Sequence, residues 1–346
     1  MKALPASYAA WYAAERSFRF LFKPFNLSAF LKLAAVAVVT EGTLVSFRYT
    51  ISSSTPSDDP SISLSALTHQ PGFVFFAVLA GLAALVICLL LYYFVIRLRF
   101  ALFHSLLHRT PALRPGWNLY RAQADRLFNG SLLVWSIFFL LFLLFVAVVT
   151  AAAFALFSAR TEEGLLDPGN FLFLFFPCAA FGLLLLLLAL VAEVILHDFI
   201  LPHMAIEDFS FREAWKTVRG HILANRDSFF SYLILRIVLP LCAAVVLVPV
   251  GLLAGWAAFG ILSASATGFN AMLEDASGAG AVLGIAVQIL FVAVAAMAGC
   301  LLAAIFGGPL GIWLRMYALV FYAGYYKPLG NLLETLPAEF IPSEGF

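Results

Sequence analysis

Long apolar stretches alternate with short polar stretches along the chain. Each apolar stretch can cross the hydrocarbon core of a bilayer, about 30 Å thick, which takes about 20 helical residues. The stretches between them show no strand-like alternation, and open sheet edges are not tolerated in lipid, so the spans should be helical. The pattern predicts an all-α bundle of six transmembrane helices, near residues 27–47, 72–96, 131–157, 171–196, 229–260 and 281–312.

Composition places the chain in the same class. Hydrophobic residues make up 63% of the chain, which contains 36 Phe and has a mean hydropathy of +1.00, far above the values of water-soluble domains. The four cysteines all fall within predicted spans and none forms a CxxC motif, so neither a disulfide framework nor a cysteine metal site is expected. We expect one transmembrane helical domain over residues 1–346, with an interfacial helix at 1–26 and a cytoplasmic tail at 327–346.

The basic residues predict the orientation, because Lys and Arg are retained on the cytoplasmic side of a membrane. With both termini inside, all of the 20 Lys and Arg residues except Arg48 and Arg160 lie at or near the cytoplasmic face. We therefore expect a multi-pass protein of the plasma (inner) membrane whose basic cytoplasmic face meets anionic lipid. The basic residues are spread over four segments that flank spans, which argues against nucleic acid as a partner.

A short pattern recurs three times. An aromatic segment follows each even-numbered span, as FALFH at 100–104, FILPH at 199–203 and YALVF at 317–321. A segment with Trp and Arg precedes each odd-numbered span, and both residue types suit the membrane interface. We predict cytoplasmic helical elbows at 97–128 and 197–228, and a pseudo-threefold repeat of helix pairs. The expected interfacial anchors are Trp11, Trp117, Trp215, Arg121 and Arg219.

The histidines of the elbows allow two interpretations. His104 and His203 occupy equivalent positions of the repeat, and the third copy has Phe321 there, which favours packing. No Glu stands between His104 and His108, so the HExxH pattern of zinc proteases is absent. A metalloenzyme site would require the two elbows to touch and to bring together His104, His108, His197, Asp198 and His203.

Four polar residues inside the spans are stronger functional candidates, because a charge in hydrocarbon costs at least about 2.5 to 3.5 kcal/mol unless it is paired or hydrated. Glu41 lies near the middle of the bilayer. It could be a protonated carboxyl bonded to a neighbouring helix, or a functional acid that lines a cavity. Glu193 and Arg236 lie on consecutive spans and could form a structural salt bridge. Gln288 is a lesser candidate for the same interior.

Three segments carry a resemblance to known membrane proteins: FILPHMAIEDFSFREAWKTVRGHILANRDSFFSYLILR at 199–236, which follows LHD, FLFKPFNLSAFLKLA at 20–34, and LRMYALVFYAGYY at 314–326. The chain resembles uncharacterised bacterial and archaeal six-helix membrane proteins, and is distantly similar to the membrane domain of some glycerophosphodiester phosphodiesterases. His203 departs from the pattern, which has an aliphatic residue there. The resemblance implies a plasma-membrane module linked to lipid metabolism, and its motifs include no catalytic residue.

No catalytic signature is present. GAGAVLG at 278–284 differs from GxGxxG and precedes a membrane helix, so it does not indicate a dinucleotide site. We expect a non-enzymatic membrane module, without a cofactor, that organises lipid or partner proteins through its elbows. The alternative is a transporter or channel for a small molecule or lipid. It would use the intramembrane acid and helix breaks at Pro240, Pro249 and the GGPLG of 307–311.

Overall fold

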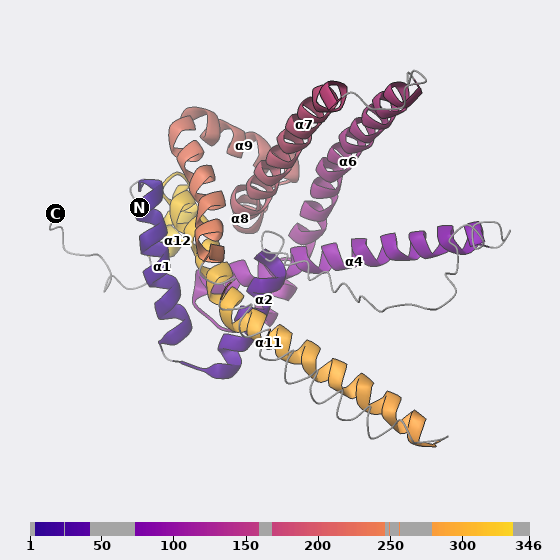
Figure 1. Ribbon diagram of the computed structural model, residues 1–346. Coiled ribbons are helices and arrows are strands. Elements are labelled where there is room, and N and C mark those ends of the chain that lie inside the picture. The colour runs from indigo at the N-terminus through magenta and orange to yellow at the C-terminus, as the bar shows by residue number, and fades with distance from the viewer. Residues whose placement is uncertain are drawn as a thin grey trace. The chain divides into compact units, whose positions relative to one another are not determined.

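The computed structural model describes residues 4–23, 25–41, 73–158, 168–245, 249, 256 and 279–334. Within these residues every named element is helical (Figure 1), which confirms the all-α class. A helix at Arg226–Val245 follows α9. The other elements are α1 (Ala6–Phe22), α2 (Leu27–Glu41), α4 (Phe73–His108), α5 (Arg114–Leu119), α6 (Arg121–Ser158), α7 (Pro168–Val194), η2 (Ile195–Ile200), α8 (Leu201–Ile206), α9 (Phe211–Ala224), α11 (Ala279–Ala323) and α12 (Lys327–Glu334).

Five helices in the described part are long and apolar enough to cross a membrane: Phe75–His108, Arg121–Phe154, Phe176–Ile206, Arg226–Val245 and Met297–Ala323. They correspond to the second through sixth predicted spans. The first predicted span, 27–47, is represented by α2, whose 15 residues are too few to cross about 30 Å of hydrocarbon at 1.5 Å per residue. Its remaining residues lie outside the described part. The structure thus supports a membrane protein with five candidate spans.

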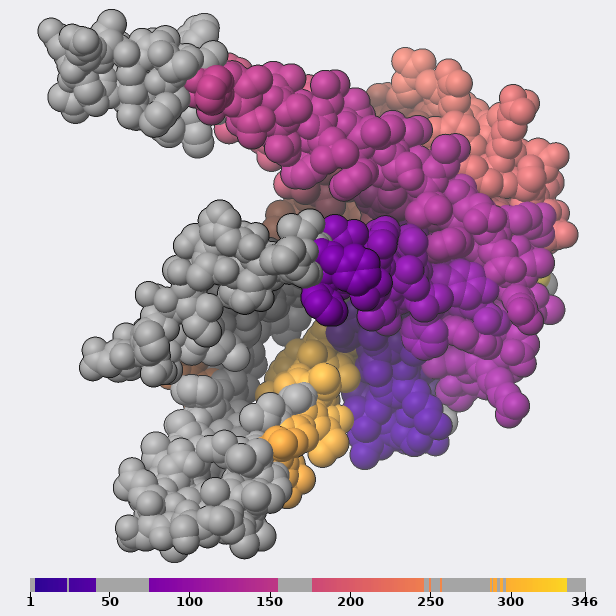
Figure 2. All heavy atoms as spheres, turned by 90° about the vertical axis from the view of Figure 1, so that its right-hand side faces the viewer, coloured from indigo at the N-terminus to yellow at the C-terminus, as the bar shows by residue number. Residues whose placement is uncertain are grey.

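The chain forms two compact units. Unit 1 comprises residues 1–15, 119–237 and 314–346, and unit 2 comprises 16–118 and 238–313. In unit 1, α6 and α7 pack side by side (Figure 1), and α7 continues through η2 into α8. Residues of α6 are the magenta spheres in Figure 2. Exposed apolar side chains along this hairpin include Leu133, Leu140, Leu144, Leu183 and Leu186.

Aromatic rings form the interior of unit 1. Phe199 of η2 lies 5.2 Å from Tyr232 and 5.0 Å from Tyr322, measured between ring centroids, and Tyr232 stacks on Phe321 at 4.5 Å. All four rings are at most 2% exposed. Such rings bury large apolar areas, and offset pairs add about 0.5 to 1.5 kcal/mol each. The aromatic segment at the end of α11 therefore packs against η2 and the start of the helix Arg226–Val245.

In unit 2, α2 packs against α4, and α11 approaches α2 through glycines. A Cβ at Gly308 would overlap Ala34, and a Cβ at Gly311 would lie 3.1 Å from the Ala37 carbonyl oxygen. Ala34 and Ala37 are fully buried, so small residues on both helices allow the backbones to approach closely.

The GGPLG segment at 307–311 is a possible helix break or a site of close packing by its sequence, and α11 continues through it with Pro309 inside the helix. Proline removes one backbone hydrogen bond and clashes with the preceding turn. We attribute the continuity to the close packing of the neighbouring glycines on α2, which holds this turn of α11 in place. Pro240 also lies inside a helix, and most residues around Pro249 lie outside the described part.

We expect Gly308→Ala to lower the free energy of unfolding by about 1 to 3 kcal/mol, the usual cost of forcing an extra methyl into packed helices. Gly299→Ala is the matched control on the same helix, because a Cβ there would meet nothing within 4 Å. The control should be neutral or stabilising by up to about 1 kcal/mol, the helix preference of Ala over Gly. Thermal unfolding in one detergent measures both, and equal midpoints for the two variants would contradict the contact.

Candidate functional site

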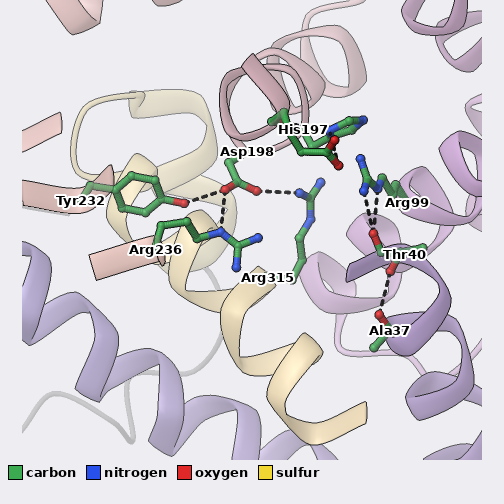
Figure 3. Close-up of polar contacts among 9 residues, drawn as sticks. Ala37, Thr40, Arg99, His197, Asp198, Tyr232, Arg236 and Arg315 are labelled. Atoms are coloured by element: carbon green, nitrogen blue, oxygen red, sulfur yellow. Dashed lines mark hydrogen bonds and ion pairs between the residues drawn. The ribbon is translucent and has the colours of Figure 1, made fainter. Parts of the chain in front are cut away.

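A buried carboxylate is the centre of the polar contacts in unit 1 (Figure 3). Asp198 Oδ2 accepts hydrogen bonds from the Tyr232 hydroxyl at 2.8 Å and from Arg236 Nε at 3.0 Å. Its Oδ1 accepts a hydrogen bond from Arg315 Nη1 at 3.0 Å. Asp198 and both arginines are between 1 and 3% exposed, and Tyr232 is fully buried. One carboxylate thus joins η2 to the helix Arg226–Val245 and to the end of α11.

The turn that carries Asp198 departs from the α-helix, and Pro202 explains why. A proline has no amide hydrogen, and its ring collides with the carbonyl four residues earlier, which here belongs to Asp198. Between α7 and α8 the helix widens into the π-helical turn η2, a feature often found at functional sites. His197, also in η2, donates from Nδ1 to the Glu193 carbonyl at 2.9 Å, and a Glu193 carboxylate oxygen lies 3.6 Å from the same nitrogen.

The network explains how charged side chains are tolerated in an apolar segment. An isolated buried ion costs several kcal/mol of desolvation, which mutual attraction and well-formed hydrogen bonds can offset. Asp198 accepts two hydrogen bonds from guanidinium groups and one from a phenol, so both of its carboxylate oxygens have hydrogen-bond donors. Removing one partner of such a group is far more costly than removing an exposed pair, because the remaining charges stay buried.

Arg236 could pair with Glu193 by its place in the sequence, and the acid that accepts its Nε hydrogen bond is Asp198. Asp198 is a possible metal ligand by sequence, and its role as the centre of an ion network was not predicted. A usable signal existed. Asp198 is an acid directly after an apolar run, and Arg236 and Arg315 follow apolar runs on two other helices. The widening of the helix at η2, which rotates Asp198, could not be read from residue spacing.

A second buried network surrounds His203 of α8, which is 0% exposed. Its Nδ1 lies 3.2 Å from a Glu207 carboxylate oxygen, and its Nε2 lies 2.7 Å from the Tyr322 hydroxyl. With Glu207 ionised, Nδ1 carries the hydrogen and Nε2 accepts from Tyr322. The Tyr326 ring lies 4.1 Å from the imidazole. The hydrogen bonds from Glu207 through His203 to Tyr322 connect α8 to the end of α11.

Residues of α6 fix the turn that leads from α8 into α9. Asp208 has a φ of 55°, a left-handed conformation that Asp adopts more readily than most residues. Arg126 forms an ion pair with its carboxylate and donates to its carbonyl oxygen at 3.1 Å, and Gln123 donates to the carboxylate at 2.9 Å. A Cβ at Gly130 would overlap the ring of Phe211, so only glycine lets the first residue of α9 lie against α6.

A capping box begins α9. The Ser210 side chain accepts a hydrogen bond from the Glu213 amide, and the Glu213 carboxylate accepts from the Ser210 amide at 2.9 Å. The hydroxyl and amide of Ser210, which both donate to this carboxylate, hold the pKa of Glu213 below its usual value. Ala214 and Val218 of α9 are buried, whereas the opposite side of the helix is exposed. The helix is therefore docked on one face only.

In unit 2, the predicted intramembrane acid Glu41 is buried at the end of the described part of α2. Beside it, Arg99 of α4 donates to the Thr40 carbonyl oxygen from Nε at 3.0 Å and from Nη2 at 2.7 Å (Figure 3). A backbone carbonyl oxygen carries partial negative charge, so a guanidinium group suits it. Arg99, which we expected at the membrane interface, is only 3% exposed.

The remaining predicted residues have varied surroundings. Trp11, Trp215, Arg121 and Arg219 are exposed, in agreement with interfacial roles that stay predictions. The Arg97 guanidinium instead lies over the Trp117 ring, with 4.1 Å between Cζ and the ring centroid. Arg97 also donates a hydrogen bond to the Trp117 carbonyl oxygen at 2.8 Å. Gln288 falls within α11, and its side chain lies outside the described part.

The elbow histidines belong to different units, with the rings of His104 and His108 4.4 Å apart in unit 2 and His197 and His203 in unit 1. Within the described ranges, no group of three or more His, Cys, Asp or Glu side chains could hold a metal ion. Asp198, the carboxylate of the hypothetical metal site, is bonded to two guanidinium groups, which repel a cation.

Comparison with known proteins identifies the family. The profile of a family of unknown function, DUF7544, matches residues 7–332. The chain belongs to this family. No curated protein and no solved structure matches the chain. The expected relation to glycerophosphodiester phosphodiesterases stays an expectation, and the contacts described above are the basis for reasoning about what this DUF7544 chain does.

For this DUF7544 chain we expect Asp198→Asn to lower the free energy of unfolding by about 3 to 5 kcal/mol, because two guanidinium groups would stay buried without their carboxylate. Asp208→Asn is the matched control. It removes the same charge from a pair with Arg126 in which the Asp208 side chain is 67% exposed, and should cost no more than about 1 kcal/mol.

Thermal unfolding in detergent checks both variants. Adding Arg315→Met to Asp198→Asn should recover part of the lost stability, since it removes one of the two uncompensated charges. If Asp198→Asn unfolds at the same temperature as Asp208→Asn, the network does not hold unit 1 together.

Proposed function

We propose that this protein is a non-enzymatic membrane module that gathers anionic lipid through the exposed face of α9. The observation that carries this proposal is the distribution of side chains around that helix. At 100° per residue, five exposed positions of α9 fall within about 100° of one another. They are Arg212, Trp215, Lys216, Arg219 and Leu223, and we call them the basic face.

The basic face combines the two properties that suit a membrane surface. Its three cations can contact phosphate groups, and Trp215 and Leu223 can enter the boundary between headgroups and acyl chains. Glu213, the one acid of α9, stands about 100° away from Arg212 and is bonded to Ser210, and it also attracts Lys216, so it offsets the charge of the face only in part. The buried residues Ala214 and Val218 lie on the opposite side.

The place of α9 in the chain supports contact with the bilayer. Candidate spans end at Ile206 and begin at Arg226, so α9 lies only a few residues from membrane helices on both sides. The distribution of Lys and Arg favours the cytoplasmic side for this segment and for both termini, in the plasma membrane. The inner leaflet of that membrane carries anionic lipid, which attracts basic segments by about 1 kcal/mol per cation near the surface.

Lipid fits the basic face better than nucleic acid or an acidic peptide. A nucleic-acid surface needs cations that track a backbone over a long groove, whereas these three cations are confined to two turns of one helix. An acidic peptide would leave the exposed indole of Trp215 without a defined pocket. The mixed apolar and cationic surface matches a lipid headgroup region, and lipid is the occupant to which we commit.

The test is retention of lipid by the full-length protein in nanodiscs of mixed zwitterionic and anionic lipid. Native mass spectrometry after release gives the ratio of the two lipids bound to the protein. The variant Arg212→Gln/Lys216→Gln/Arg219→Gln should reduce the enrichment of anionic lipid about tenfold or more, since each cation contributes about 1 kcal/mol. The enrichment of the wild type should also fall with added salt.

The matched control is Arg212→Lys/Arg219→Lys, which keeps the charge and should keep the enrichment. An unchanged enrichment in the triple Gln variant would contradict the proposal. A second outcome would also contradict it. If the lipid ratio does not depend on the charge of the basic face, and an acidic protein co-purifies only with the wild type, the basic face binds a peptide.

A further inference from the structure

The packed side of α9 ends in a histidine that faces another histidine. The ring of His221 lies parallel to that of the buried His203, with 6.2 Å between centroids and an interplanar angle of 14°. The same His221 ring lies edge-on to Tyr322 at 6.2 Å. His221 is thus the residue through which α9 meets the hydrogen-bonded line that joins α8 to α11.

The groups around this histidine pair come from each element packed against it. Glu207, at the end of α8, is the carboxylate that bonds to His203, and its side chain is partly exposed. Tyr322 of α11 donates to His203, while Tyr326 and Phe209 pack against its ring.

Several other charged groups on elements that contact α9 have bonded partners. In η2, Asp198 is bonded to two guanidinium groups and His197 to the Glu193 carbonyl. On α6, Arg126 is paired with Asp208. Among the described residues, the acid bonded to the histidine pair is therefore Glu207.

Two histidines and one carboxylate make the contact between His203 and His221 sensitive to pH. With both imidazoles neutral, the pair packs as two aromatic rings, and the Nδ1 hydrogen of His203 meets Glu207. A single added proton is compensated by Glu207. When both rings carry a proton, two cations stand about 6 Å apart and the carboxylate of Glu207 is bonded to His203, and like charges at this distance repel.

We propose that the contact between His203 and His221 is a pH-sensitive latch that holds α9 on α8 and releases it on acidification. Since this inference rests on the proposed function, its consequence is that acidification lowers the enrichment of anionic lipid by the basic face. Histidine is the side chain whose ordinary titration lies between about pH 5 and 8, so the response falls in that range.

The direction follows from linkage. The docked state holds the rings of His203 and His221 about 6 Å apart, so two imidazolium charges would repel there, whereas an undocked α9 separates them. The undocked state therefore binds more protons, and the free energy of docking weakens as the pH falls. The latch is fully closed above the range in which histidine titrates and opens below it.

The experiment is hydrogen exchange of the full-length protein in nanodiscs at neutral pH and near pH 5.5, read as protection factors so that the intrinsic pH dependence of exchange cancels. The amides of α9 around Ala214 and Val218 should lose about tenfold of their protection on acidification. His221→Gln should abolish this change, because one imidazolium remains and Glu207 compensates it. His108→Gln, at an exposed histidine of unit 2, is the control and should respond like the wild type.

The outcomes separate the latch from the lipid proposal. Equal protection at both pH values in the wild type, or a loss of protection that persists in His221→Gln, overturns the latch, whatever the lipid ratio shows. Protection that falls in the wild type alone supports the latch, even if the triple Gln variant has shown that the basic face does not bind lipid. Anionic lipid ratios measured at the same two pH values should fall in the wild type and stay constant in His221→Gln.

Discussion

The fold of unit 1 depends on one buried carboxylate, whose charge requires hydrogen-bond partners. Asp198 sits in an apolar helix and is almost fully buried, so its charge must be met by hydrogen bonds from elsewhere. Arg236 and Arg315 supply them from two other helices, and Tyr232 adds a third. Because hydrogen bonds have a defined geometry, this network fixes the register of the three segments more narrowly than apolar packing does. The aromatic interior then forms around them.

The hydrogen-bond network around Asp198 helps to position α9. The segment from η2 through α8 carries His203, and α6 supplies Arg126, which secures the turn at Asp208. A helix docked by Ala214 and Val218 on one side must turn its cations, Trp215 and Leu223 to the other side. The basic face is thus a consequence of the buried contacts, and the proposed lipid function and its control by protons both rest on that arrangement.

The sequence predicts the class and most of the spans, because long apolar stretches in a chain of this composition have few alternatives to membrane helices. The helical elbow predicted at 197–228 corresponds to η2, α8 and α9, while the interfacial role of Trp215 stays a prediction. The first predicted span, 27–47, stays a prediction, because the described part includes only its residues 27–41, which form α2. The GGPLG segment is a possible break or packing site by its sequence, and its glycines serve close packing on α2.

The partners of buried charges could not be predicted in the same way. Arg236 bonds to Asp198, which lies in the π-helical turn η2 that Pro202 favours, and residue spacing does not reveal such a turn. The proposed lipid function requires that α9 holds its basic face against the bilayer. This contact can be tested directly by the depth of a spin label at Leu223→Cys in a cysteine-free background, from its accessibility to oxygen and to a water-soluble nickel chelate. We expect the label at headgroup depth, and a label fully in water would show that the basic face does not lie on the membrane.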